Sequence, residues 1–230
     1  MKMLLEKTGF VKASDVKIPD TYYNRMKTGI KPIDDFLGGS EESTGGLLRG
    51  GVYMLAAGAG LGKSTFCLQI SEALLKTDKR VAYATGEESL EQLAFTCKRL
   101  NVKEVPIAVR TDIDDICLEM KNLDFIIVDS FQSLSVKKHM TNRKKENYCI
   151  SRLCYAAKQN SCCVIALCHL TKAGTYKGST TLLHSADACF YLEADEEEPT
   201  IRNFYWTKNR FGPASTTMQA VIDRTGYIFE

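Results

Sequence analysis

One glycine-rich segment constrains the fold of this 230-residue chain more than any other feature. Residues 57–65 read AGAGLGKST, after the apolar run 51–56 and before a stretch, residues 65–75, whose apolar side chains recur at helical spacing. A buried strand, a glycine-rich turn and a helix in this order let backbone N–H groups converge on phosphate oxygens. The segment therefore predicts an α/β fold with a nucleotide phosphate site at this turn. The alternative is an ordinary turn with a chance lysine.

Each residue type in the segment has a distinct chemical role. Glycine lets the backbone approach an anion closely, Lys63 can reach β- and γ-phosphates, and Ser64 can hold Mg²⁺. Ala57 is the one departure from the pattern G-x-x-x-x-G-K-[ST], and its Cβ would crowd the turn if its φ were positive. The predicted nucleotide-binding residues are Gly58, Ala59, Gly60, Leu61, Gly62, Lys63, Ser64 and Thr65.

Apolar runs and helical patterns alternate over the rest of the chain. Strands are expected at residues 81–85, 107–109, 125–129 and 163–168, and helices at 28–39, 89–100, 113–121 and 148–159. Later strands, at residues 188–192, 203–207 and 217–223, lack helices between them. This order predicts a mostly parallel central sheet flanked by helices, with antiparallel strands at the C-terminal edge. The acidic stretch 193–198 is expected to be a solvated hairpin loop, and residues 1–27 an arm or linker.

Composition says more about the environment of the chain than about its chemistry. The formal net charge of +2 is too small to indicate nucleic-acid binding by itself, and no apolar run is long enough to cross a membrane. The chain has nine cysteines, an odd number without a C-x-x-C pair, mostly within apolar runs. We expect them to be buried and reduced, which argues against a zinc ribbon and favours a cytoplasmic protein.

Carboxylates follow two of the expected strands. Asp129 ends the apolar run 125–129 and is placed to support Mg²⁺, although it could instead cap the next segment. Glu87, with Glu88 beside it, follows the strand 81–85, where a carboxylate can orient the water that attacks a phosphoanhydride. The alternative is that these acids only begin a helix, because acids favour helix N-termini.

A glutamine and a histidine are expected at the same edge of the sheet. Gln132 stands just beyond Asp129, and His169 follows the expected strand 163–168. Each is a candidate sensor of the γ-phosphate, since the carboxyl ends of parallel strands meet at one edge. Each could equally be a structural hydrogen-bond partner.

Two segments rich in cations are candidates for nucleic-acid contact. Residues 133–147 are expected to form a basic loop, and residues 172–181 a second loop with glycines, lysines and one aromatic residue. Flexible basic loops can follow a phosphate backbone, and a tyrosine can stack on a base. The alternative is a pair of solvated loops. The candidate DNA-binding residues are Lys137, Lys138, Arg143, Lys144, Lys145, Lys172, Tyr176 and Lys177.

Two further cations stand far along the chain, in the segment 208–212 with the sequence KNRFG. A glycine-rich phosphate loop together with remote Lys208 and Arg210 suggests a triphosphate held from two sides. That arrangement is typical of ring and filament ATPases, in which one subunit completes the site of its neighbour.

Taken together, these motifs resemble the ATPase core of the bacterial RadA/Sms family, within the RecA-like superfamily. The resemblance covers residues 11–230, and its most specific part is the segment 208–212. It also rests on residues 11–16, 28–30, 37–39, 60–65, 86–89, 129–132 and 169–172. The resemblance implies a RecA-like ATPase domain at residues 28–230, with ATP and Mg²⁺ as its ligands.

The resemblance also implies residue roles and partners. The catalytic residues would be Lys63, Glu87, Gln132, Lys208 and Arg210, with the last two reaching the ATP of an adjacent subunit. Ser64 and Asp129 would hold the metal. Members of the family bind single-stranded DNA, form hexameric rings or filaments, and act in recombination and branch migration. A single-strand-binding protein is a further expected partner, and no membrane is expected to be involved.

The sequence also departs from the family pattern. Typical members carry a four-cysteine zinc finger, a Lon-protease-like domain and a glycine where this chain has Ala57, so the sequence is more similar to core-only, phage-encoded recombinases related to RadA. Residues 208–213 also fit the K-x-R-x-G-P element of the helicase DnaB, which leaves a helicase motor open. A regulatory module with structural ATP is a third alternative. Phe10 and Ala13 resemble the F-x-x-A docking strand of Rad-type recombinases, or belong to an ordinary linker.

Overall fold

A single large sheet organises the chain, and the computed structural model describes residues 10–38, 45–170 and 180–229. Its strands follow the order β3-β2-β4-β5-β1-β6-β7-β8-β9. Their bounds are β1 Val52–Ala57, β2 Val81–Thr85, β3 Ile107–Val109, β4 Phe125–Asp129, β5 Cys163–His169, β6 Ala188–Ala194, β7 Ile201–Asn209, β8 Thr217–Asp223 and β9 Gly226–Ile228. Pairing is parallel from β3 to β6 and antiparallel from β6 to β9. The predicted mixed sheet is therefore confirmed, and β9 is an addition.

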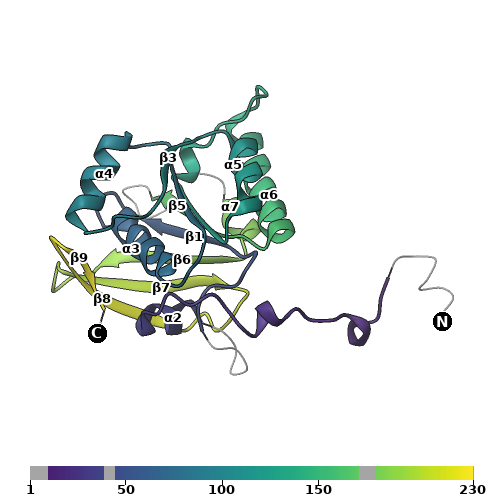
Figure 1. Cartoon of the computed structure of the whole chain (residues 1–230), viewed down its shortest axis with the longest axis horizontal. Coiled ribbons are helices and arrows are strands. Elements are labelled where there is room, and N and C mark those ends of the chain that lie inside the picture. The colour runs from purple at the N-terminus through teal and green to yellow at the C-terminus, as the bar shows by residue number, and fades with distance from the viewer. Residues whose placement is uncertain (1–9, 39–44, 171–179, 230) are drawn as a thin grey trace.

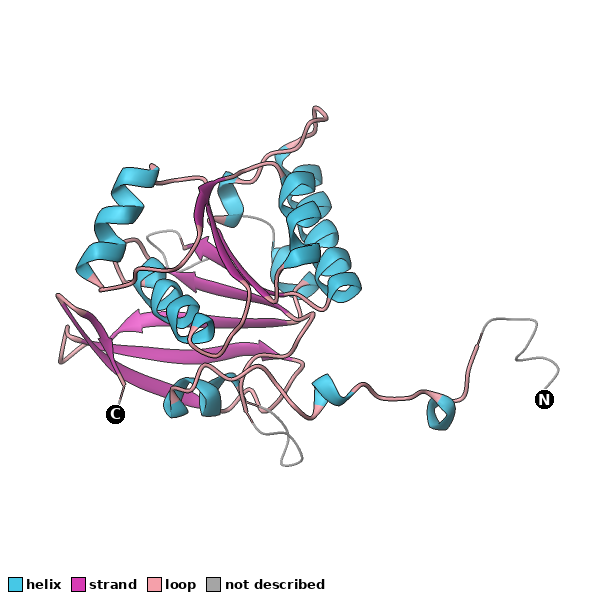
Figure 2. Ribbon diagram, viewed as in Figure 1, coloured by secondary structure: helices cyan, strands magenta, loops and turns pink. Residues whose placement is uncertain are grey.

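Helices cover both faces of this sheet, as Figure 1 and Figure 2 show. Alternate residues of β1 point to opposite faces: Tyr53 and Leu55 join one core cluster, and Met54 joins the other. The first cluster includes side chains from α2 Lys31–Leu37, α3 Lys63–Leu75 and α4 Leu90–Arg99. The second includes side chains from α5 Ile113–Glu119, α6 Asn142–Asn160 and α7 Thr180–Ser185. Both faces are thus buried, which explains the continuous apolar runs of the central strands.

Short 3₁₀ helices fill several of the connections, and none was predicted. They are η1 Ala13–Asp15, η2 Asp20–Tyr22, η3 Met120–Asn122 and η4 Phe131–Ser133. The first two belong to a segment that extends away from the sheet (purple in Figure 1). Phe10 is 73% exposed within it. The chain meets the body of the molecule at Arg25, which donates to the backbone oxygens of Gly38 and Phe211. The division between an arm at residues 1–27 and a domain at 28–230 stays a prediction.

Helix α6 corrects one expectation. It begins at Asn142, not at residue 148, so Arg143, Lys144 and Lys145 stand on its first turns rather than in a loop. The reason is that arginine, lysine and glutamate are good helix formers, so an exposed basic stretch can extend a buried helix outward. Residues 180 and 181, also expected in a loop, begin α7.

The cysteines have the burial that the sequence predicts. Eight of the nine cysteines are buried and Cys154 is half-buried, none of them in a disulfide, which confirms their packing role. Burial raises the pKa of the Cys162 thiol to about 12, so it stays protonated and unreactive. Within residues 10–38, 45–170 and 180–229, no helix has the length and apolar character needed to cross a bilayer.

Candidate active site

The glycine-rich loop joins β1 to α3 at the carboxyl edge of the parallel strands. Ala57 is the last residue of β1, paired with His169 on β5 and Leu192 on β6, and it is not among the residues with positive φ. Its Cβ therefore packs in the core and does not crowd the turn. The substitution of the usual glycine is accommodated because the strand continues one residue into the motif.

Two later glycines do require their residue type. Gly60 has φ 76° and Gly62 has φ 96°, both in the left-handed region. A Cβ on Gly62 would stand 2.7 Å from Tyr227 Oη and from Ile222 Cδ1. The loop thus combines a backbone conformation and a close approach that only glycine allows at this position.

Lys63 begins α3 and bends back over the loop. Its Nζ donates to the carbonyl oxygens of Gly58 at 2.9 Å and Ala57 at 3.2 Å. Burial lowers the pKa of Lys63, while the nearby carboxylates of Asp129 and Glu87 act in the opposite direction. The helix N-terminus adds a partial positive charge, so the site attracts anions from two sources.

A pocket of about 320 Å³ opens beside this loop. It collects side chains from the loop, from the ends of β2, β4 and β5, and from α4. The lining residues are Ala59, Gly60, Gly62, Lys63, Ser64, Thr65, Glu87, Glu88, Thr96, Arg99, Asp129 and His169. Of the predicted nucleotide-binding residues, all but Gly58 and Leu61 line this cavity, together with the predicted metal and water-activating residues.

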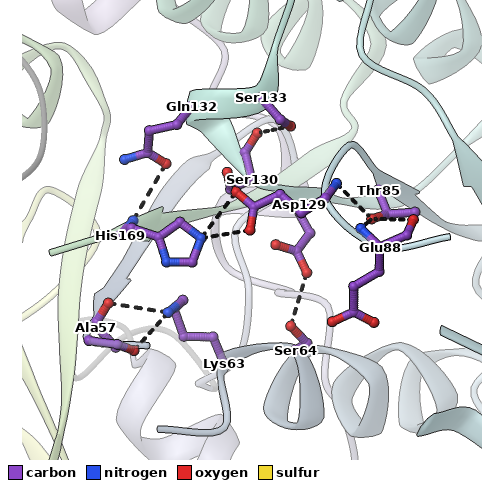
Figure 3. Close-up of polar contacts among 12 residues, drawn as sticks. Ala57, Lys63, Ser64, Thr85, Glu88, Asp129, Ser130, Gln132, Ser133 and His169 are labelled. Carbon is purple, nitrogen blue, oxygen red and sulfur yellow. Dashed lines mark hydrogen bonds and ion pairs between the residues drawn. The ribbon is translucent and has the colours of Figure 1, made fainter. Parts of the chain in front are cut away.

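Asp129 and Ser64 are in direct contact in the lining of the pocket. Ser64 Oγ donates to Asp129 Oδ2 at 2.9 Å, and Tyr83 Oη donates to the same oxygen at 2.5 Å (Figure 3 shows Ser64 and Asp129). Burial, with the Asp129 charge next, raises the pKa of Tyr83 well above its usual range, so Tyr83 stays a donor. A hydroxyl and a carboxylate side by side are the oxygen ligands that Mg²⁺ prefers when phosphates and water complete its shell. Ser64 and Asp129 therefore fit the predicted metal site, where the ion would neutralise phosphate charge.

Glu87 is held by two partners from neighbouring strand ends. Its carboxylate contacts His169 Nε2 at 2.9 Å and accepts a hydrogen bond from Ser130 Oγ. The backbone N–H of His169 donates to Gln132 Oε1 at 3.4 Å. The structure thus brings the three predicted residues together: Glu87 and His169 line the pocket, and Gln132 contacts the backbone of His169.

Glu88 lies beside Glu87 and is shaped by the same turn. The backbone N–H groups of Glu87 and Glu88 both donate to Thr85 Oγ1, at 3.3 and 3.1 Å. Burial raises the pKa of Glu88, and the charges of Asp129 and Glu87 add to that effect. A carboxylate with a raised pKa is a stronger base, so Glu88 is a second candidate for activating water.

Several residues at the site were not predicted from the sequence. Tyr83 and Ser130 hold carboxylates, and Arg99 donates to Thr65 Oγ1 at 3.5 Å and to the Arg224 carbonyl at 2.8 Å. Tyr83 could have been found from strand alternation, because it shares a face of β2 with Thr85. Arg99 stands three residues after Thr96, on one face of α4, which is the only signal that the sequence carries for it.

Lys208 and Arg210 lie away from this pocket. Lys208 pairs with Cys189 near the start of β6, and its Nζ donates to the backbone oxygens of His184 and Ala186. Arg210 contacts Asp187 Oδ1 at 3.4 Å. The structure does not bring these two cations to the phosphate loop of their own chain, which is compatible with the expectation that they act on a neighbour.

The predicted DNA-binding residues divide into three groups. Lys137 pairs with Asp115 at 3.1 Å, and Lys145 donates to the Leu134 carbonyl at 2.9 Å, so the structure gives both of them partners within the chain. Lys138, Arg143 and Lys144, in the preceding connection and on the first turn of α6, are exposed cations, and Lys137 is exposed as well. The remaining candidates, Lys172, Tyr176 and Lys177, lie outside the described residues.

Comparisons with known proteins agree with this geometry. The family model described as "ATPase: KaiC" matches residues 26–105. The DNA repair protein RadA of Rickettsia typhi is 31% identical over 199 residues, which cover 82% of this chain and 43% of that protein. The RadB recombinase structure has a TM-score of 0.64 at 19% identity and covers 88% of this chain and 98% of its own. A DnaB-like replicative helicase structure has a TM-score of 0.73 at 14% identity. The match covers 99% of this chain and 66% of the helicase chain.

The fold and the site together define a P-loop ATPase core of the RecA-like class. Within that class, the chain is a homologue of the ATPase core of the bacterial RadA family. It spans less than half the length of the RadA proteins that it matches. The two solved structures show the fold that it shares, since their sequences have diverged far from this one.

Proposed function

We propose that the chain is a DNA-dependent ATPase that assembles on single-stranded DNA and promotes homologous recombination, through strand annealing, exchange or branch migration. The observation that carries the ATPase part is the Ser64–Asp129 contact of 2.9 Å in the pocket that Lys63 and Glu87 also line. The similarity to RadA, a DNA repair protein, supports the DNA part.

The residues divide the chemistry among them. The loop N–H groups and Lys63 bind the phosphates, and Ser64 and Asp129 hold Mg²⁺. Glu87 orients the attacking water and accepts its proton, and Gln132 reports the state of the γ-phosphate to the connection that follows β4. Lys208 and Arg210 of an adjacent copy stabilise the charge that develops on the transferred phosphate. The catalytic unit is therefore an oligomer, either a ring or a filament.

Single-stranded DNA is the proposed nucleic-acid partner. Lys138, Arg143 and Lys144 present exposed positive charge near the start of α6, which is connected through η4 to Asp129 at the pocket. Nucleotide state and DNA contact can therefore influence each other through this short connection. We also propose a cytoplasmic location and a single-strand-binding protein as a further partner.

Turnover measured with and without DNA tests the proposal. ATP hydrolysis by the purified chain should rise when single-stranded DNA is added, and Lys63→Ala should abolish hydrolysis while circular dichroism shows an intact fold. Hydrolysis that ignores DNA in an assembled sample would redirect the search to a different partner. An assembled sample that binds ATP without any turnover would support the alternative of a regulatory module.

A helicase motor is the second candidate. The DnaB-like replicative helicase shares this fold over almost the whole chain, and residues 208–213 fit a K-x-R-x-G-P element. Unwinding of a forked duplex, measured beside annealing and strand exchange, separates the two activities. Unwinding without annealing or exchange would favour the helicase.

A further inference from the structure

Side chains of two C-terminal strands donate hydrogen bonds to the phosphate-binding loop. The carbonyl oxygen of Leu61 accepts a hydrogen bond from Tyr227 Oη at 3.0 Å and another from Arg202 Nε at 3.1 Å. These donors stand on β9 and β7, 166 and 141 residues further along the chain. We propose that Tyr227 and Arg202 are positioning residues that orient the loop for phosphate binding. This inference rests on the proposed ATP site.

Peptide geometry explains how a contact outside the loop acts on its inner side. In a planar trans peptide, the C=O group and the following N–H group point in opposite directions. Because the Leu61 carbonyl points to Tyr227 and Arg202, the N–H of Gly62 is directed away from those strands. Gly62 lines the pocket, together with Gly60 and Lys63. The two donors therefore hold this N–H in the direction that a bound phosphate needs.

The strand that supplies Tyr227 is itself fixed to the helix that follows the loop. Gln69 on α3 accepts from the Tyr227 N–H at 2.8 Å and donates to the Tyr227 carbonyl at 3.0 Å. The Tyr227 ring is 4% exposed and packs against Phe66 and Phe204. Tyr227 thus contacts α3 through its backbone and the loop through its hydroxyl, so it cannot move independently of either.

Two further observations agree with a positioning role. Gly62 allows the close approach of Tyr227, because a Cβ at that position would stand 2.7 Å from the hydroxyl oxygen. Burial raises the pKa of Tyr227, so its hydroxyl remains a hydrogen-bond donor throughout the physiological range. If the carbonyl lost both donors, the peptide could rotate and present an oxygen to the phosphates, which would repel them.

Tyr227→Phe is the decisive variant, because it removes one hydroxyl and keeps the packed ring. The matched control is Tyr205→Phe on β7, where the hydroxyl donates to Glu193 at 2.6 Å and the side chain is half-buried. Equilibrium affinity is measured for ATP and for a fluorescent ADP analogue. We expect Tyr227→Phe to weaken both about three- to tenfold, as for loss of one neutral hydrogen bond, and the control to stay within about twofold.

A double-mutant cycle with Arg202→Met completes the test. The double variant should bind nucleotide at least about tenfold more weakly than the wild type, since the carbonyl then has neither donor. Affinities are compared at a temperature where all variants are fully folded by near-ultraviolet circular dichroism, so a lower melting temperature cannot account for the result. A purely structural role would lower the melting temperature and leave these affinities unchanged.

The outcomes separate this inference from the proposed function. If the wild type binds ATP, Lys63→Ala does not, and Tyr227→Phe binds like the wild type, the positioning role is wrong and the ATP site stands. If the wild type itself fails to bind nucleotide, the proposed function fails first. Weaker nucleotide binding by Tyr227→Phe, but not by Tyr205→Phe, supports the positioning role of Tyr227.

Discussion

Lys63 and Arg210 lie near opposite ends of the central strand β1. Lys63 begins α3 just beyond the last residue of β1, whereas Arg210 donates its backbone N–H to Asp187, whose own N–H bonds to Val52 at the start of β1. Ala188 and Leu192, which pair with the two ends of β1, are separated by roughly 13 Å of strand at about 3.3 Å per residue. Joint action of Lys63 and Arg210 on one triphosphate therefore requires a second copy of the chain.

Replacement of Arg210 by alanine should lower turnover about 10²- to 10³-fold while ATP still binds, because the arginine would act mainly on transition-state charge. Lys63→Ala should instead lose binding as well as turnover. Nucleotide affinity and steady-state hydrolysis, measured on the same assembled samples, distinguish the two variants.

Mixing the two inactive variants provides the control for action between subunits. A Lys63→Ala subunit still offers Arg210, and an Arg210→Ala subunit still offers an intact loop, so mixed oligomers should regain turnover that neither variant has alone. Co-assembled mixtures that stay inactive would contradict the proposal that Arg210 acts on the ATP of a neighbouring subunit.

Substitution of Glu87 by glutamine should reduce turnover about 10²- to 10⁴-fold and leave ATP affinity nearly unchanged, since an amide cannot accept a proton from water. Glu88→Gln is the matched control, because Glu88 lines the same pocket on the same turn. If the larger loss of turnover follows Glu88→Gln, the water-activating role belongs to Glu88, whose pKa is raised by burial.

The strands and the loop were predictable because their signals are local. Residues 125–129 form a continuous apolar run that ends in an acid, and the structure buries all five on β4. The start of α6 was not predictable in this way: its first turns carry exposed cations, which a loop and a helix accommodate equally. Strand β9 begins with Gly226, a residue type that favours turns over strands, so its sequence carries no clear strand signal.

The contacts that tune the site were out of reach for a different reason. Tyr227 meets Leu61 only because the sheet order places the C-terminal strands beside the loop, and no local pattern encodes that order. The position of Lys208, away from the pocket, was more predictable than the Tyr227 contact. A hairpin loop expected at residues 193–198 already pairs Lys208 with the start of the preceding strand, as β6 and β7 show.

Neutralising Lys138, Arg143 and Lys144 with glutamine should weaken binding to single-stranded DNA and flatten its salt dependence. At about 0.7 per phosphate contact, the slope of log affinity against log salt should fall by roughly two units at most. Titrations at several salt concentrations measure this slope. The structure selects these three cations because Lys137 and Lys145 already have partners in the chain.

A matched charge control is available on the same chain. Lys98, Lys103 and Lys121 are also exposed, and their replacement by glutamine removes the same net charge from other surfaces. An equal loss of slope in both triple variants would point to a general charge effect and remove the α6 cations from the DNA site.

Asp124 gives a prediction for stability that is independent of nucleotide. Its carboxylate accepts hydrogen bonds from Arg80 Nε at 3.0 Å and Arg49 Nη1 at 2.8 Å, which ties the start of β4 to the residues before β2 and β1. The Arg80 hydrogen bond, aided by Arg49, holds the pKa of Asp124 well below its usual range. Asp124→Asn should therefore lower the free energy of unfolding by about 1–3 kcal/mol near neutral pH.

The pH dependence of this difference has a definite sign. Because the folded pKa is lower than the unfolded value of about 3.9, the stabilisation is complete above that value and is lost as pH falls through the folded pKa. Urea unfolding of the wild type and Asp124→Asn should give a constant difference from about pH 5 to 7 that shrinks below about pH 4. Glu119→Gln, which removes a half-exposed ion pair with Arg110, should change stability little. A difference that grows in acid would show that Asp124 does not stabilise the fold through its charge.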